Sequence, residues 1–194
     1  MATNKPGERK LQILQTLATM LEQPKGEKIT TAALAAKLAV SEAALYRHFA
    51  SKAQMFEGLI EFIEQTLFGM INKISADETD GMRQLDAILA LLLGFAQKNP
   101  GMTRVLIGDA LVNENERLQT RINQMHDRIE ATLRQCLRVA ATQNNVSPEH
   151  DTNAEANLML AFVIGRWHQF AKSGFKRLPL DQFDAQKVLL FKFA

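Results

Sequence analysis

The sequence predicts an all-α fold, and three observations support this prediction. Long stretches of Ala, Leu, Gln, Glu, Lys and Met, which are good helix formers, separate the five prolines. Apolar residues recur at helical spacing throughout the chain. No alternating run of Val, Ile and Thr bounded by turn residues indicates a strand. We therefore expect helices joined by loops that contain the prolines.

Four helices are expected in the N-terminal third of the chain. They cover residues 8–22, 30–38 and 41–49, followed by a long segment that begins after residue 51. Hydroxyl side chains precede the last three, and each can accept a hydrogen bond from a free N–H of the first helical turn. The expected caps are Thr30 or Thr31, Ser41 and Ser51.

Five further helices are expected at roughly residues 81–97, 102–112, 115–140, 153–173 and 184–193. Segment 115–140 carries one apolar stripe, and its arginine-rich faces are interpreted as solvated, with binding of an acidic partner segment as the alternative. The connection 142–152 contains two asparagines and a proline and is predicted to be the most mobile segment.

Segment 153–173 differs because it is apolar on every side between Leu158 and Ile164. Such a helix must be covered on both sides. We expect the same helix of a second subunit to cover it in a two-fold four-helix interface, with segment 184–193 beside it. Burial inside one subunit is the alternative. The predicted interface residues are Leu158, Phe162, Trp167 and Phe170.

Charge is distributed unevenly along the chain. Residues 1–52 hold eight Lys or Arg and four Glu, a net charge of +4, whereas the remainder carries −2. A basic N-terminal segment on a mildly acidic body favours contact with a polyanion.

Residues 29–52 have the pattern of a helix-turn-helix, whose second helix enters the major groove of DNA. Ala35 is small enough for the two helices to cross closely. An ordinary antiparallel helix pair is the alternative. The apolar sides can meet in a small core formed by Leu34, Leu38, Leu45 and Phe49.

The polar side chains of this segment suit a phosphate backbone. Hydroxyls and free amides at a helix start favour an anion, and Lys52 adds a positive charge. Small residues in the first turn of the reading helix let it lie deep in the groove, where Ala43 or Ala44 can contact a thymine methyl group. The candidate DNA-binding residues are Thr30, Thr31, Ser41, Ala43, Ala44, Tyr46, Arg47, His48 and Lys52.

Several of these positions resemble the signature of TetR-type regulators, namely Ile29-Thr30, Leu34-Ala35, Val40-Ser41, Leu45-Tyr46, His48-Phe49 and Ser51-Lys52. The resemblance implies an all-α homodimer that binds a palindromic DNA operator. We expect a flexible basic tail over residues 1–7, a three-helix DNA-binding head over 8–67, and a helical regulatory and dimerisation body over 68–194. Ala39 stands where the family has a turn glycine, so a positive φ there would strain the backbone.

A wider set of segments resembles the nucleoid occlusion factors, a TetR-type family; they are residues 41–49, 59–64, 91–95, 99–101, 121–124 and 183–185. This resemblance implies binding to dispersed palindromic sites and, in the DNA-bound state, inhibition of the tubulin-like division GTPase FtsZ over the nucleoid. Met70 replaces an expected arginine of the partner surface. The other implied partner-binding residues are Leu91, Gly94, Lys98 and Asn99.

A transcriptional repressor released from its operator by a small apolar inducer is the alternative function. The inducer would need an apolar pocket in the body, and few polar groups lie there to orient it. The candidate lining residues, which can equally fill the core, are Met82, Leu85, Leu89, Phe95, Met102, Met125, Met159 and Phe162.

Composition and the remaining motifs argue against other classes. The longest apolar run, 87–96, is half as long as a membrane span, and the N-terminus lacks the apolar region of a secretory signal. The single cysteine, Cys136, cannot form an internal disulfide or a Cys-rich zinc site. His126 and Glu130 are too few to hold a metal. We expect a cytoplasmic, nucleoid-associated protein with no enzymatic activity, cofactor or metal.

Overall fold

The computed structural model describes residues 6–23, 29–143 and 151–191, and within these ranges the chain is helical without strands, as predicted. The elements are α1 (Pro6–Leu21), α2 (Thr31–Lys37), α3 (Glu42–Tyr46), α4 (Lys52–Asp77), α5 (Gly81–Lys98), α6 (Pro100–Leu106), the 3₁₀ helix η1 (Asp109–Leu111), α7 (Glu116–Thr142), α8 (Thr152–Lys172) and α9 (Phe183–Phe191).

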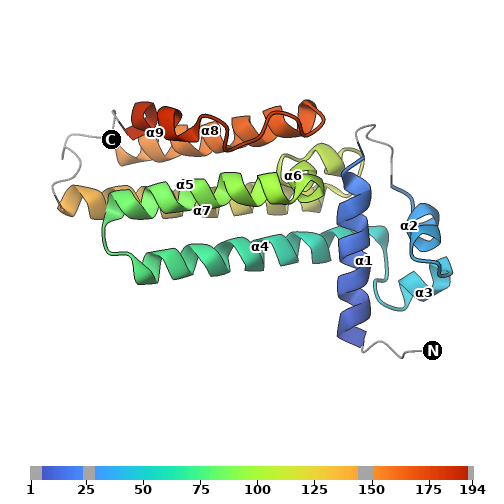
Figure 1. Cartoon of the computed structure of the whole chain (residues 1–194). Coiled ribbons are helices and arrows are strands. Elements are labelled where there is room, and N and C mark those ends of the chain that lie inside the picture. Colours follow the sequence, from blue (N-terminus) through green and yellow to red (C-terminus); the bar gives the residue numbers. More distant parts are fainter. Residues whose placement is uncertain (1–5, 24–28, 144–150, 192–194) are drawn as a thin grey trace.

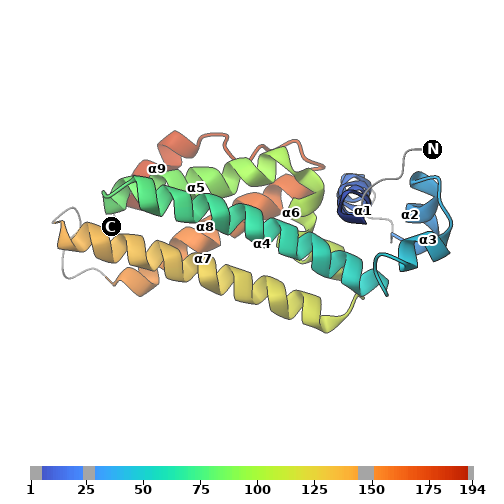
Figure 2. The same ribbon diagram turned by 90° about the horizontal axis from the view of Figure 1, so that it is seen from below.

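The helices form a small unit at one end of a long bundle (Figure 1). We call α1, α2, α3 and the first two turns of α4 the head, and the remaining helices the body. In the body α4, α5, α7 and α8 run along one another, and α9 lies beside α8. Helix α1 crosses the end of the bundle and is seen along its axis in Figure 2. The head therefore projects α2 and α3 away from the body.

Two prolines begin helices instead of lying in loops, which corrects the sequence prediction. Pro6 is the first residue of α1, and Pro100 is the first residue of α6. Proline is accepted there because the first helical N–H has no intrahelical partner to lose. The helix expected over 102–112 is also shorter, because Gly108 adopts a φ of 76° and the chain continues as η1.

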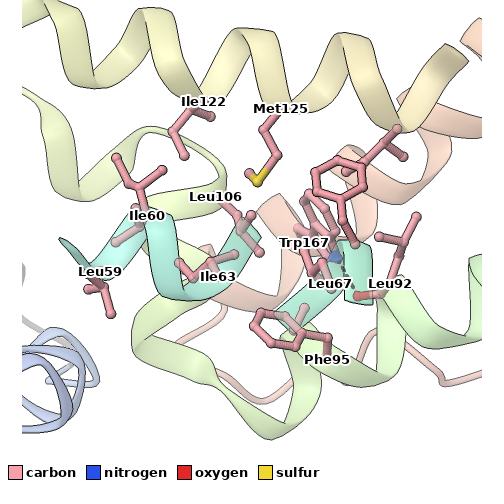
Figure 3. Close-up of a cluster of buried hydrophobic side chains, with 14 of the residues drawn as sticks. Leu59, Ile60, Ile63, Leu67, Leu92, Phe95, Leu106, Ile122, Met125 and Trp167 are labelled. Carbon is pink, nitrogen blue, oxygen red and sulfur yellow. Dashed lines mark hydrogen bonds between the residues drawn. The ribbon is translucent and has the colours of Figure 1, made fainter. Parts of the chain in front are cut away.

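The body core is continuous and apolar, and Figure 3 shows its centre. Trp167 of α8 is completely buried there, and its indole Nε1 donates a hydrogen bond of 3.0 Å to the backbone oxygen of Leu92. Leu59, Ile63 and Leu67 of α4 and Met125 of α7 contribute to the same core. Burial of apolar side chains from several helices in one core is the main contribution to the stability of a helical bundle.

Two residues predicted for the subunit interface are therefore inside a single subunit. Trp167 and Phe170 are 0% and 1% exposed within one chain. The sequence prediction was wrong for them, because α8 is covered by α5, α6 and α7 of its own subunit on that side. Leu158 and Phe162, by contrast, lie on the outer part of α8, where Leu158 is exposed and Phe162 half-buried.

The head is attached to the body by a close crossing of α1 and α6. A Cβ atom on Gly101 would lie 1.9 Å from the backbone oxygen of Ala18, so only glycine lets the two helices approach so closely. Leu21 also contacts this position. Gly101 thus fixes the angle at which α1 meets the bundle.

None of the helices in the described part of the chain has the length and hydropathy needed to cross a membrane. Most of the connection 142–152, predicted to be mobile, lies outside the described residues, as does most of the predicted tail over 1–7.

Candidate nucleic-acid interface

Helices α2 and α3 are short and depend on their caps. The Thr30 hydroxyl accepts a hydrogen bond from Ala33 N at the start of α2, and the Ser41 hydroxyl accepts one from Ala44 N at the start of α3. The Ser51 hydroxyl caps α4 in the same way. The predicted caps at positions 41 and 51 are confirmed, and of the two threonines Thr30 is the one that caps.

The turn between α2 and α3 is strained at Ala39, which adopts a φ of 53°. A side chain with a Cβ atom is disfavoured in this left-handed region. The turn is closed by hydrogen bonds from Ala39 N to Ala36 O and from Val40 N to Ala35 O. The strain expected from the missing glycine is therefore present.

Helix α3 ends at Tyr46, three residues earlier than the sequence predicted. After Tyr46 the chain turns so that the buried ring of Phe49 reaches α4, where a Cβ atom on Gly58 would lie 3.1 Å from it. Leu34 and Leu45 are buried beside it, both 1% exposed. The predicted small core forms, and Phe49 enters it from the loop rather than from a helix.

A polar cluster joins the outer surfaces of α2 and α3. The Thr31 hydroxyl donates a hydrogen bond of 2.5 Å to Glu42 Oε2, and the Tyr46 hydroxyl lies 3.5 Å from the Thr31 oxygen. Glu42 was not among the predicted site residues, although its place in the first turn of α3 was visible in the sequence. Its carboxylate fixes the Thr31 hydroxyl at the surface where the sequence placed a phosphate contact.

The other predicted DNA-binding residues form a mixed set of exposures. Ala43, Tyr46 and Arg47 are exposed, whereas Ala44 and His48 are half-buried. Tyr46 is 45% exposed, so a ligand can reach its side chain. These side chains share the outer side of α3 and the turn that follows it.

Lys52 has a partner that the sequence did not reveal. Its Nζ lies 2.5 Å from Glu114 Oε1, on the connection between η1 and α7, and 5.6 Å from the centre of the Phe56 ring. The Lys52 and Glu114 side chains are 22% and 12% exposed. The lysine side chain that was predicted to contact a phosphate is thus paired with a carboxylate of the body.

The residues implied as a partner surface lie on one side of α5 and at its end. Leu91 and Gly94 are half-buried, and Lys98 is exposed one turn further on. Asn99 joins α5 to α6, and its side-chain amide donates a hydrogen bond of 2.8 Å to Phe95 O. These four residues are therefore neighbours along a single helix.

A groove between α4 and α5 continues this surface and has a volume of about 520 Å³. Leu91 lines it together with Met70, which is 37% exposed, and with Ile74 and Ala87. Charged side chains border the apolar floor: Lys73, Asp77, Glu78 and Arg83. Met70, the position of the missing arginine, therefore adds apolar surface to the groove.

A second apolar surface lies on α8 and α9. A groove of about 270 Å³ is lined by Leu158, Phe162, Gln186, Leu189 and Leu190. Leu189 and its neighbour Val188 are each 63% exposed. Lys187 fixes α9 to α5 through an ion pair of 3.0 Å with Asp86, which also raises the pKa of Lys187 by hydrogen bonding. The sequence placed segment 184–193 beside the predicted interface, although it did not single out Val188 and Leu189 within it.

Groups that could suggest catalysis have ordinary structural roles. Burial lowers the pKa of His126, and burial raises the pKa of the Cys136 thiol to about 11. A thiol with such a pKa is protonated at neutral pH and is a poor nucleophile. Among the residues that the structure describes, no three His, Cys, Asp or Glu side chains gather as metal ligands.

A capped helix-turn-helix on an all-α body defines the class of TetR-type DNA-binding regulators. The sequence matches the family described as bacterial regulatory proteins, tetR family, over residues 24–59. It also matches the SlmA-like family described as Tetracyclin repressor-like, C-terminal domain, over residues 79–193.

Relatives with assigned names extend this match over nearly the whole chain. The nucleoid occlusion factor SlmA of Alteromonas mediterranea is 52% identical over 186 residues, which cover 96% of this chain and 95% of the relative. That of Marinomonas sp. strain MWYL1 is 48% identical over 188 residues, covering 97% and 95%. The chain belongs to the SlmA family of nucleoid occlusion factors within the TetR-type regulators. This membership implies DNA binding and dimerisation, and the family is one of regulators rather than of enzymes.

Solved structures agree on the fold. The regulator FadR from Bacillus subtilis, whose structure is a complex with stearoyl-CoA, has a TM-score of 0.77 with 12% identity and covers 95% of this chain and 98% of its own. At this level of identity the likeness concerns the fold alone.

Proposed function

We propose that the chain is a homodimer that reads palindromic DNA sites with α3 and, while bound there, inhibits FtsZ assembly through the surface of α5. The observation that carries the DNA-binding half is the outer side of the head. There, Ala43, Tyr46 and Arg47 are exposed beside the capped starts of α2 and α4. Small residues in the first turn of α3 suit entry into a major groove, and the hydrogen-bond donors that follow them suit contact with phosphates.

Dimerisation is assigned to the apolar surface of α8 and α9. Leu158 and Leu189 are exposed, and Phe162 lies between them in the same groove. Exposed apolar side chains on two adjacent helices fit a self-complementary two-fold interface. Two heads held in this way can meet successive major grooves of a palindromic site.

The FtsZ surface is assigned to Leu91, Gly94, Lys98 and Asn99 together with the groove beside them. Its apolar floor and the exposed ammonium of Lys98 suit a short amphipathic segment that carries acidic residues. A division role and a DNA role then use separate surfaces, α3 on one side and α5 with its groove on the other, so both partners can bind at once.

Genome-wide occupancy of the protein in its own cell tests the DNA-binding half. We expect many palindromic sites scattered over the chromosome, and we expect Arg47→Glu to lose them. One or two sites beside a single operon would instead favour the alternative of a local repressor released by an inducer. Of the candidate inducer-pocket residues, Leu85, Leu89, Met125 and Met159 are fully buried in the core, which favours a packing role.

Sedimentation of GTP-assembled FtsZ polymers tests the division half. The DNA-loaded protein is expected to reduce the pelleted polymer, and Lys98→Glu is expected to abolish this effect while leaving DNA affinity unchanged. Arg138→Glu is the matched control, because it reverses an exposed charge on α7 that is not part of the assigned surface. Equal inhibition by the wild type and Lys98→Glu would refute the assigned surface.

A further inference from the structure

Three ion pairs connect α4 with α7 and the residues just before it. Glu57 pairs with Arg117 at 2.7 Å, and Glu64 pairs with Arg121 at 2.6 Å. In both, α4 supplies the carboxylate. The hydrogen bonds that Arg121 donates to Glu64 also raise the pKa of Arg121. In the pair nearest the head the two charges are exchanged, because there α4 supplies the cation and the residue before α7 supplies the carboxylate.

This reversed pair is the contact between Lys52 and Glu114, and it stands where the head meets the body. The beginnings of α4 and α7 lie side by side next to the head (Figure 2). Lys52 directly follows the cap Ser51, at a helix start that favours anions. Glu114 belongs to the connection before α7 and not to the helix-turn-helix. The lysine can thus meet either a carboxylate of its own chain or a phosphate of DNA.

The surroundings make Glu114 the group that balances Lys52. Both side chains line a pocket of about 330 Å³ between head and body, together with Arg104 and Asp109. Asp109 is already engaged by the ammonium of Lys172 and lies 3.9 Å from Arg104. The pocket therefore holds two cations and two anions, and removal of Glu114 leaves a positive excess at Lys52.

We propose that Glu114 sets the affinity of the protein for DNA by competing with a backbone phosphate for the ammonium of Lys52. This inference rests on the proposed DNA-binding function of the head. In the unbound protein the carboxylate holds the lysine, and DNA binding exchanges that carboxylate for a phosphate oxygen. Each binding event then breaks one ion pair, which makes the free energy of DNA binding less favourable. The pair therefore lowers the affinity for DNA and limits non-specific binding.

The test is the affinity of the full-length protein for a labelled duplex, measured by fluorescence anisotropy over a series of salt concentrations. Glu114→Gln is expected to bind about two- to fivefold more tightly at low salt, the fold-change that corresponds to a partly exposed ion pair. Its affinity should also fall more steeply with salt, by up to about one unit of slope, because in the wild type salt weakens the competing Lys52–Glu114 pair and offsets part of the loss. The matched control, Glu116→Gln, removes the same charge two residues away at an exposed position. Its affinity for the duplex should increase less than that of Glu114→Gln.

A second background separates competition for Lys52 from general repulsion of DNA by a carboxylate. In Lys52→Gln protein, adding Glu114→Gln should leave affinity unchanged. A gain of the same size in both backgrounds would overturn the proposal, as would equal gains from Glu114→Gln and Glu116→Gln. Wild-type protein that binds DNA with the same affinity as Glu114→Gln would overturn this inference alone. Failure of all variants to bind any duplex would overturn the DNA-binding function and, with it, the inference.

Discussion

The head and the body are stabilised by different means. Helices α2 and α3 have only seven and five residues, and helices of that length do not persist alone in water. Side-chain caps and a small core hold them in place. The long helices of the body, α4, α5, α7 and α8, have between 18 and 27 residues. They are held by apolar burial around Trp167.

This difference determines which groups are left for binding in each region. In the head, the side chains that remain after capping and core formation are mainly polar and suit a phosphate backbone. In the body, apolar side chains also remain exposed after core formation at two places that suit protein partners: the groove beside Leu91 and the groove beside Leu158. The DNA partner and the protein partners are thereby kept at separate places.

The largest effect is expected from removal of the central body side chain. Trp167→Ala should lower the free energy of unfolding by about 3–5 kcal/mol, because it leaves a large cavity and removes the hydrogen bond from the indole to the Leu92 carbonyl. Urea denaturation followed by circular dichroism measures the change. The adjacent His168 is exposed, so His168→Ala should stay within about 0.5 kcal/mol of the wild type. A loss of less than 1 kcal/mol in Trp167→Ala would show that the body does not depend on this centre.

A smaller effect is expected at the junction of the two regions. Gly101→Ala should destabilise the protein by about 1–3 kcal/mol, because α1 and α6 must separate to admit the methyl group. Amide hydrogen exchange should show the loss mainly in α1. Gly69→Ala is the control, since a Cβ there meets no atom within 4 Å, and in a helix it should stabilise by about 0.5–1 kcal/mol. If Gly101→Ala increased amide exchange equally in α1 and α7, the interpretation that the head is attached to the body at Gly101 would be wrong.

Local features of the head could be predicted from the sequence, whereas contacts between distant parts of the chain could not. The caps Ser41 and Ser51 were predictable because capping depends on residues only three apart in the chain. The pairing of Lys52 with Glu114 was not predictable, since it joins residues 62 positions apart whose meeting depends on how α7 begins. The placement of Trp167 failed for a related reason, because a helix that is apolar all round does not reveal whether its cover comes from the same chain or from a second one.

The smallest effect concerns the strained turn of the head. Ala39→Gly should stabilise the head by about 0.5–1 kcal/mol, because glycine removes the cost of a Cβ at a φ of 53°, although it increases the entropy of the unfolded chain. Slower hydrogen exchange of the α2 and α3 amides, with no change in the body, is the expected observation. Ala36→Gly is the matched control, since Ala36 is exposed within α2 and glycine there should destabilise by a similar amount. If Ala39→Gly instead exchanged faster, as Ala36→Gly should, then the turn would not be strained at this position, and the stability of the head would rest on its caps and its small core alone.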